Sequence, residues 1–447
     1  MMKAYPEYKE SNISWIGKIP NHWNKTSLKN LCYINDGNHG EEYPKDNDYT
    51  DGDIGVPFIR CGDMVNQKLS HSKMIYITKE KNDSMRKGRL KTGDVLFANR
   101  GDIGKSALVT NEFDGSNLNS QIAYFRTNRD KLKNEFLLYF IISNYIFNLL
   151  NSLKMGSVLT QLPISDLSNI RIPFPSISEQ ESIVAFLNIE TARIDNLISE
   201  KEIFIKLLQE KRQALISHVV TKGLDDNVKM KPSGVEWIGD IPEHWEVKPM
   251  KYLGLLGPTK SEISGDLLSK QCSFVPMDKL KTDTLLLNEE RIVKEVIDGY
   301  TYFQDGDILF AKVTPCFENK NMCIAEGLTN GIGFGSSEIN VFRTNKFNET
   351  KFVYYLFQEE HFMQFAKSNM TGTGGLKRVP SDVVLDYKVA VPPLTEQVKI
   401  AEEVSNRFAR LALLIEETKQ SIELLKEHRT ALISAAVTGK IDVREAV

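Results

Sequence analysis

Cysteine is scarce in this sequence, and long uninterrupted hydrophobic runs are missing. The five cysteines among 447 residues form no CxxC pair and no zinc-site spacing, so we expect reduced thiols and a cytoplasmic protein. The charged N-terminal segment lacks the apolar stretch of a secretory signal. The most apolar window, residues 136–153, is interrupted by serine and asparagine, and its counterpart at 352–367 contains glutamate, histidine and lysine. Both windows therefore predict core helices rather than membrane spans.

An excess of charge and the motifs of common enzymes are also lacking. The formal net charge of −3 argues against a uniformly basic nucleic-acid-binding chain, although it permits a local basic face. The glycine-rich stretches at 101–104 and 371–375 have neither the Lys-Ser/Thr of a P-loop nor a complete GxGxxG, and no Asn/Asp-Pro-Pro-aromatic segment of an adenine methyltransferase occurs. HExxH, a serine elbow and a supported carboxylate pair are absent from the sequence as well. We therefore predict that the chain by itself is not an enzyme and needs no metal or cofactor.

What the sequence does contain is a duplication along its whole length. Residues 15–23 read WIGKIPNHW, and residues 237–245 read WIGDIPEHW. Further pairs follow in the same order: GDVLFA at 93 with GDILFA at 306, FRTN at 125 and 342, PSISEQ at 175 with PPLTEQ at 392, and RQALIS at 212 with RTALIS at 429. The segment that precedes the first nonapeptide lies at the N-terminus, whereas the RTALIS segment lies near the C-terminus. The repeat is therefore circular, and it predicts that the C-terminus returns to the N-terminus.

The nonapeptide keeps its apolar residues and changes its charges. Lys18 corresponds to Asp240 and Asn21 to Glu243, whereas the tryptophans, the Ile-Pro step and the histidine are identical in both copies. A binding site would keep its charges, so we interpret the segment as a packing joint between a long helix and the following domain. Its histidines are then structural rather than metal ligands.

Two segments without proline or glycine, 178–220 and 395–437, predict long helices with Ser178 and Thr395 near their starts. Apolar residues recur in both at alternating steps of four and three, which is the pattern of a coiled-coil seam. The predicted seam residues are Leu187, Ile194, Ile198, Ile205, Leu208 and Leu215 in the first helix and Val404, Phe408, Leu411, Ile415, Ile422, Leu425 and Leu432 in the second. Since one helix carries the chain away and the other brings it back, we expect an antiparallel pair. The alternative is that each helix packs separately on its own domain.

Residues 15–155 and 237–372 show short alternating strand signals that close with an aromatic helix, which predicts two α+β domains. Loops after the GDVLFA and GDILFA strands and after the aromatic helices combine cations, amides and glycines, which suit phosphates and base edges. The candidate DNA-contacting residues in these loops are Asn99, Arg100, Lys105, Lys154, Ser157, Thr160 and Gln161 in the first half and Lys312, Lys320, Lys377 and Arg378 in the second. Arg60, which lies outside these loops, is a further candidate. For any one of them, a solvated surface turn or a flexible return loop is the alternative.

The ordered set of duplicated pieces resembles the specificity subunit of type I restriction-modification systems over essentially the whole chain. The resemblance rests on the two nonapeptides, the GDVLFA and GDILFA strands, the IPFPSISEQ and VPPLTEQ helix entries, and the RxALIS helices in circular order. It implies an α+β fold in which two α/β target recognition domains are separated by two long antiparallel helices that form a coiled coil, with an internal pseudo-twofold repeat. The implied recognition domains are residues 1–172 and 223–390, with a central spacer helix at 173–222 and a distal one at 391–447.

The resemblance further implies a non-catalytic, sequence-specific subunit that binds double-stranded DNA. Each recognition domain would read one half of a bipartite site, while the helices would set the spacing and dock two methyltransferase (modification) subunits. Restriction/translocase subunits would complete a cytoplasmic complex without contact to a membrane. The loop pieces NRGDIGK and SVLTQ become KVTPCFENK and TGGLK in the second half, so the contact residues stay open. Two alternatives remain: a coiled-coil scaffold that does not read DNA, and a stand-alone DNA enzyme with an unrecognised motif.

Overall fold

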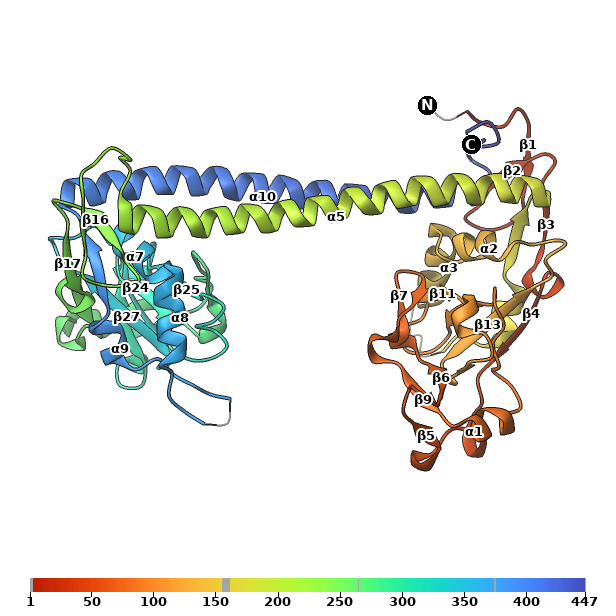
Figure 1. Ribbon diagram of the computed structural model, residues 1–447, viewed down its shortest axis with the longest axis horizontal. Coiled ribbons are helices and arrows are strands. Elements are labelled where there is room, and N and C mark those ends of the chain that lie inside the picture. The colour runs from red at the N-terminus through yellow and green to blue at the C-terminus, as the bar shows by residue number, and fades with distance from the viewer. Residues whose placement is uncertain (1–2, 155–160, 264, 374, 447) are drawn as a thin grey trace. The chain divides into compact units, whose positions relative to one another are not determined.

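The computed structural model describes residues 3–154, 161–263, 265–373 and 375–446 (Figure 1). The chain divides into two compact units. Unit 1 comprises Met1–Lys201 and Lys419–Val447, and unit 2 comprises Glu202–Thr418. Each unit therefore takes in one α+β block and one end of each long helix. Within the described ranges, no helix is both long and apolar enough to cross a membrane.

In its described residues, unit 1 contains two four-stranded sheets, three two-stranded ladders and four short α-helices. The first sheet has the antiparallel order β11 (Ser106–Leu108), β10 (Val95–Ala98), β13 (Ile122–Thr127) and β4 (Cys32–Asp36). The second has the order β12 (Asn117–Leu118), β6 (Val56–Ile59), β9 (Ile75–Ile77) and β5 (Tyr49–Thr50). The ladders are β1 (Tyr8–Glu10) with β2 (Lys18–Pro20), β3 (Asn24–Ser27) with β14 (Arg171–Phe174), and β7 (Met64–Val65) with β8 (Lys68–Leu69). The short helices are α1 (Lys79–Ser84), α2 (Asn134–Ile141), α3 (Asn144–Lys154) and α4 (Ile164–Asn169).

Unit 2 repeats this plan. Its first sheet has the order β18 (Gly254–Leu256), β27 (Ile339–Thr344), β24 (Ile308–Ala311) and β25 (Met322–Ile324). The second has the order β22 (Glu290–Ile292), β19 (Gln271–Val275), β26 (Ile332–Gly335) and β23 (Thr301–Gln304). The ladders are β15 (Met230–Pro232) with β16 (Asp240–Pro242), β17 (Glu246–Pro249) with β28 (Lys388–Val391), and β20 (Leu280–Lys281) with β21 (Thr284–Leu285). The short helices are α6 (Val293–Val296), α7 (Thr350–Gln358), α8 (Glu360–Ser368) and α9 (Ser381–Leu385). The predicted α+β class and the predicted duplication are therefore confirmed.

The repeated strands β10 and β24 are buried on both faces, which explains why their sequences are apolar without alternation. Side chains of a strand point alternately to opposite faces of the sheet. In β10, Val95 and Phe97 join the core cluster under the long helices, while Leu96 and Ala98 join a second cluster on the other face. In β24 the same division separates Ile308 and Phe310 from Leu309 and Ala311. Each strand thus lies between two small cores.

The aromatic windows form pairs of core helices, as predicted. In unit 1 the break between α2 and α3 lies at Ser143, whose hydroxyl donates to the carbonyl of Phe140 at 2.6 Å. In unit 2 the break lies at Glu359, whose carboxylate caps α8 by accepting from the backbone N–H of Phe362 at 2.9 Å. The polar residues that interrupt both windows therefore end one helix and begin another.

The long helices are α5 (Ile177–Lys222) and α10 (Leu394–Val437), within two residues of the predicted ranges. All predicted seam residues are buried or half-buried. In unit 1, Asp195 Oδ1 lies 2.8 Å from Arg429 Nε, and in unit 2 the Arg212 guanidinium lies 4.4 Å from the centroid of the Phe408 ring. These contacts join early residues of one helix to late residues of the other in each unit, which is antiparallel pairing. The alternative of separately packed helices is wrong.

Candidate nucleic-acid interface

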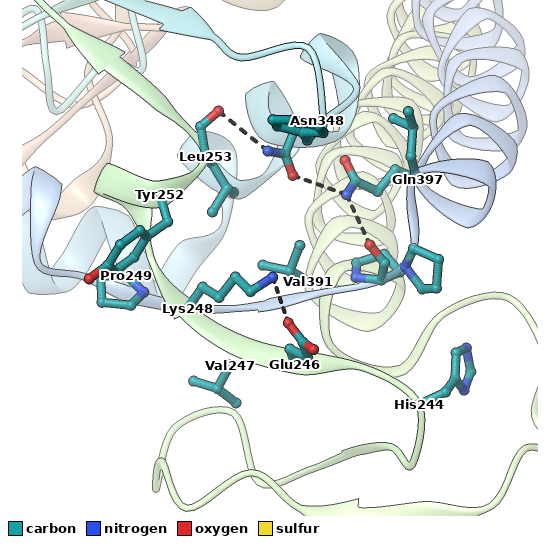
Figure 2. A pocket seen from close by; sticks show the side chains of 14 residues that line it. His244, Glu246, Val247, Lys248, Pro249, Tyr252, Leu253, Asn348, Val391 and Gln397 are labelled. Atoms are coloured by element: carbon teal, nitrogen blue, oxygen red, sulfur yellow. Dashed lines mark hydrogen bonds and ion pairs between the residues drawn. The ribbon is translucent and has the colours of Figure 1, made fainter.

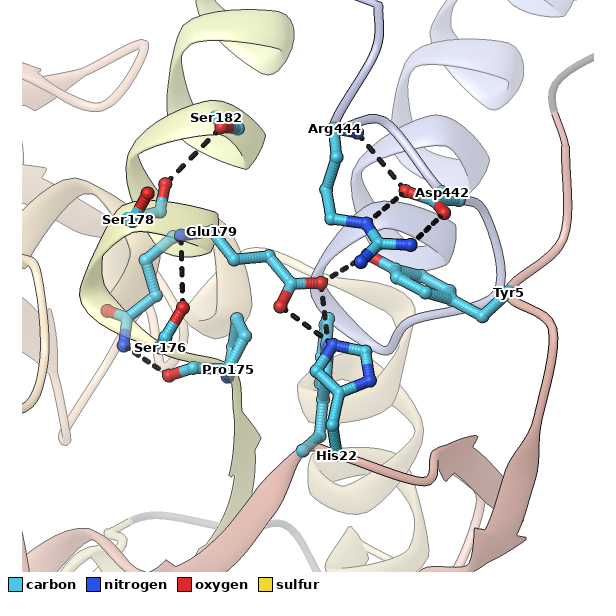
Figure 3. Close-up of polar contacts among 11 residues, drawn as sticks. Tyr5, His22, Pro175, Ser176, Ser178, Glu179, Ser182, Asp442 and Arg444 are labelled. Atoms are coloured by element: carbon cyan, nitrogen blue, oxygen red, sulfur yellow. Dashed lines mark hydrogen bonds and ion pairs between the residues drawn. The ribbon is translucent and has the colours of Figure 1, made fainter.

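The joint between long helix and block in unit 1 is organised by one buried carboxylate, Glu179 of the SEQ motif. Its Oε1 accepts from the Trp23 indole N–H at 3.0 Å and from the Tyr5 hydroxyl at 2.8 Å, and its Oε2 lies 2.8 Å from His22 Nε2 (Figure 3). Burial, followed by the hydrogen bond to Glu179, raises the pKa of Tyr5 far above its ordinary value. The nonapeptide histidine thus contacts a glutamate at the start of α5, in agreement with a structural role.

The joint in unit 2 uses the same residue types with fewer contacts. Glu396 Oε2 lies 2.7 Å from His244 Nε2. The indole N–H of the fully buried Trp245 has no hydrogen-bond partner among the described residues. Trp23 and Trp245 are both fully buried, which agrees with a packing role. The first tryptophan of the segment differs between the copies. Trp15 is 64% exposed, whereas the Trp237 ring stacks on the His361 ring with 4.6 Å between the ring centroids. The packing interpretation is therefore wrong for Trp15.

The glutamine of each SEQ/TEQ motif fastens the start of the long helix to the aromatic helix. Gln180 accepts from the backbone N–H of Lys133 at 2.8 Å and donates to the carbonyl of Pro175 at 3.0 Å. Gln397 accepts from the backbone N–H of Glu349 at 2.8 Å and donates to the carbonyl of Pro392 at 2.9 Å. The repeated letters in this motif therefore correspond to repeated hydrogen bonds.

The two ends of the chain meet in unit 1, as the circular repeat predicts. The backbone N–H of Asp442 donates to the carbonyl of Lys3 at 2.8 Å, and the ammonium of Lys440 donates to the carbonyl of Ile16 at 2.8 Å. Lys440 also donates to the carbonyl of Lys18, and in unit 2 Lys222, shifted by one position in the repeat, donates to the carbonyl of Asp240, the counterpart of Lys18. The same connection is thus made once within a continuous chain and once across the termini.

A repeated arginine ties each RxALIS segment to a hairpin of its block. Arg212 donates to Asp283 Oδ2 at 2.5 Å, and Arg429 donates to Gln67 Oε1 at 3.4 Å. Asp283 and Gln67 occupy the turns of the β20–β21 and β7–β8 hairpins, where both have positive φ. In the sequence these arginines interrupt the apolar seam, but in the structure they connect the α+β blocks to the long helices.

The first-half candidates for DNA contact have different surroundings. Asn99 is fully buried and donates to the carbonyl of Leu162 at 3.3 Å, so it supports the loop from inside. Arg100 is half-buried, with a backbone bridge to the exposed Gln161. Lys105 is exposed and its ammonium lies 2.7 Å from Asp102, which raises the pKa of Lys105.

Arg60 is half-buried, and its Nε lies 3.5 Å from the buried Asp63 carboxylate. Lys154 ends α3, but its side chain lies outside the described part of the chain, as do Ser157 and Thr160. The structure therefore brings Arg100, Lys105 and Gln161 to one loop region through the bridge and the β10–β11 turn.

The second-half candidates gather around a hairpin between α8 and α9. Lys377 and Arg378 are exposed on its return arm, and the backbone of Lys312 accepts from the N–H of Val379 at 2.9 Å. Arg378 Nε and Nη2 each donate to the Glu338 carboxylate at 2.8 Å, which lowers the pKa of Glu338. Sequence reasoning missed Glu338, because nothing in the sequence signals its pairing across 40 residues.

Lys320 lies apart from that hairpin. Its ammonium donates to Gln213 of α5 at 2.6 Å and lies 3.1 Å from the Glu360 carboxylate of α8. It thus holds the block to the long helix.

A solvent-accessible cavity of about 640 Å³ lies in unit 2 (Figure 2). Its lining includes His244, Lys248, Tyr252 and Gln397. Lys248 pairs with Glu246 at 2.5 Å, and the Gln397 amide is already bonded within the joint. The described residues contain no group of three or more His, Cys, Asp or Glu side chains able to hold a metal ion.

Comparison with known protein families gives a match in each half of the chain. The model of the type I restriction modification DNA specificity domain matches residues 20–206 and 287–424. These ranges include the repeated strands β10 and β24 and most of both long helices.

Two curated relatives illustrate the similarity. The specificity subunit of the type I restriction enzyme EcoEI from Escherichia coli is 36% identical over 195 residues, which is 42% of this chain and 32% of that protein. The chain thus spans about a third of the length of this relative, and the same holds for the EcoAI specificity subunit. The putative type I restriction enzyme MjaX specificity subunit of Methanocaldococcus jannaschii is 25% identical over 459 residues, covering 98% of both chains.

Solved structures share the fold at low sequence identity. A chain from structures that describe complex assembly and conformational transition of the type I R-M system superposes with a TM-score of 0.68 and 17% identity, covering 94% of this chain and 98% of that one. The HsdS subunit from Thermoanaerobacter tengcongensis superposes with a TM-score of 0.54 and 18% identity, covering 97% of this chain and all of that one.

Proposed function

The chain belongs to the type I restriction-modification DNA specificity family, and on that premise we propose that it recognises a bipartite DNA sequence. Each α+β block reads one half-site. The observation that carries the proposal is the contrast within the duplication. The His–Glu contact of the joint, the hydrogen bonds of the SEQ/TEQ glutamines and the contact of a helix arginine with a hairpin turn recur in both units. The exposed loops diverge between the two halves, as two domains that read different bases require.

The proposed domains are the recognition domains 1–172 and 223–390 and the spacer helices 173–222 and 391–447. Proposed DNA-contacting groups are the exposed Lys105, Gln161, Lys377 and Arg378, together with Arg100 and Lys312. The exposed ion pairs of Lys105 and Arg378 have small free energies, so DNA phosphates can replace the carboxylates. Asn99, Arg60 and Lys320 instead hold the loops in position.

The long helices are proposed to dock two methyltransferase subunits, which would supply the catalysis. Large apolar side chains are exposed on them, away from the seam. In unit 2 these are Ile203, Phe204 and Leu207 on α5 and Leu394, Leu413 and Leu414 on α10, and in unit 1 they are Ile189 on α5 and Leu424 on α10. Ile203, Phe204 and Leu207 have the spacing of one helix face. Exposed apolar side chains gathered on one face are typical of a protein-binding surface. Restriction/translocase subunits would join the same cytoplasmic complex.

Expression of this chain with its methyltransferase subunits in a host without adenine methylation tests the proposal. Sequencing that detects N6-methyladenine should reveal one bipartite motif with a fixed gap. Exchange of residues 223–390 for those of a relative should change one half of the motif and leave the other half unchanged. Methylation without a sequence motif would contradict DNA reading, and a change in both halves would contradict the division into independent domains.

A further inference from the structure

Residues 371–373 and 375–378 of unit 2 form the two arms of a hairpin that connects α8 with α9 and projects from the rest of the unit (Figure 1). Hydrogen bonds hold these arms at the base. The backbone groups of Thr371 and Arg378 exchange hydrogen bonds of 2.9 and 2.7 Å. On the other side of the return arm, the N–H of Thr314 donates to the carbonyl of Lys377 at 3.0 Å. The arm is therefore paired on both edges.

The side chain of Thr314 and one glycine also hold the described parts of the two arms together. The hydroxyl oxygen of Thr314 accepts from the N–H of Lys377 at 3.1 Å and donates to the carbonyl of Gly375 at 2.7 Å. Gly372 has φ +134°, and a Cβ there would lie 2.4 Å from the carbonyl oxygen of Leu376. A side chain at this position would collide with backbone, so the glycine allows the two arms to approach.

The hairpin presents a leucine to solvent beside a lysine. Leu376 is 56% exposed, and the Lys377 ammonium has no carboxylate partner among the described residues. The neighbouring Arg378 is neutralised by Glu338. The exposed Leu376 does not contribute to the core of unit 2. Together, Leu376 and the Lys377 ammonium fit a partner that combines an apolar group with negative charge.

Double-stranded DNA is such a partner in its major groove. The major groove is wide enough for a two-stranded β-ribbon, whereas the minor groove is about half as wide. The 5-methyl group of thymine is the apolar group in the major groove, and it is recognised through apolar contacts. Phosphates line the groove edges, within the reach of a lysine adjacent to the reading side chain.

We propose that Leu376 is a specificity-determining residue that contacts the 5-methyl group of a thymine in the half-site read by unit 2, while Lys377 contacts an adjacent phosphate. The proposal rests on the proposed DNA-reading function and deepens it. Leu376 distinguishes thymine from other bases by shape and hydrophobicity, without a hydrogen bond.

The test uses the full chain in complex with its methyltransferase subunits and a duplex that carries the mapped site. Each thymine of the second half-site is replaced in turn by deoxyuridine, which removes only the methyl group, and affinity is measured by fluorescence anisotropy. One replacement should weaken binding by the wild-type complex about fourfold, the effect of one methyl-sized apolar contact. The same replacement should leave the affinity of the Leu376→Ala complex unchanged. Leu376→Met should keep the methyl dependence, because methionine is also a large apolar side chain.

The outcomes separate this proposal from the function on which it rests. The role of Leu376 is refuted if no deoxyuridine weakens wild-type binding, or if Leu376→Ala keeps the full methyl dependence. If the wild-type complex binds the site and a scrambled duplex equally, the DNA-reading function itself fails. Unchanged thermal unfolding of Leu376→Ala would verify that the exposed tip is not required for folding.

Discussion

Neighbouring leucines of α5 allow the seam and the outer face of the helix to be tested separately. Leu208 is 6% exposed, whereas Leu207 is 54% exposed. Leu208→Ala removes a nearly complete apolar burial and leaves a cavity, so we expect a loss of about 2–5 kcal/mol in the free energy of unfolding. Leu207→Ala removes less than half of a leucine's burial and leaves no cavity, so the expected loss is about 1 kcal/mol or less. The two substitutions change the same atoms and differ only in position.

The assay is urea unfolding of the full chain, followed by circular dichroism at 222 nm, with the transition midpoint as the readout. A much larger midpoint shift for Leu208→Ala than for Leu207→Ala is expected. Equal shifts would refute the reasoning, because the seam would then have no more packing than the outer face. A second readout is binding of the methyltransferase subunit, where Leu207→Asp should weaken association while leaving the midpoint nearly unchanged.

The remaining predictions concern the joint, the hairpin and the helix length. Glu179→Ala should lower the free energy of unfolding of unit 1 by about 2–5 kcal/mol, because two buried donors lose their acceptor. Glu396→Ala in unit 2 should lower it by about 1 kcal/mol. Equal midpoint shifts in urea would contradict this difference. Arg378→Gln should raise the pKa of Glu338 towards its ordinary value, measured by carbon NMR titration. Since a carboxylate with a lowered pKa stabilises the folded state only above that pKa, the hairpin contact should be lost as the pH falls through it. Insertion of seven residues near Lys201 with a matching insertion in α10 should lengthen the gap between half-sites without changing their bases, as read from the methylated motif; altered bases would contradict the spacer role.

Sequence patterns alone predicted the long helices, their seam and the circular closure. Periodicity of apolar residues determines which face of a helix is buried, so the seam positions could be read from their spacing. The duplication strengthened this inference, because the same frame occurs at positions such as Leu215 and Leu432. The strands β10 and β24 were also visible in the sequence, since a strand between two cores is apolar on both faces.

The environments of the polar residues depended on the tertiary structure. Asn99 and Lys105 lie six residues apart in one candidate loop, yet one is fully buried and the other pairs with Asp102 at the surface. Arg378 follows α8, and it pairs with Glu338, which directly precedes β27. The sequence does not show whether a charged or amide side chain faces solvent, a carboxylate or the interior. Its burial and its partners depend on segments that lie far apart in the chain. The sequence by itself therefore determined the repeated framework, and only the tertiary structure decided which polar groups support that framework and which remain exposed.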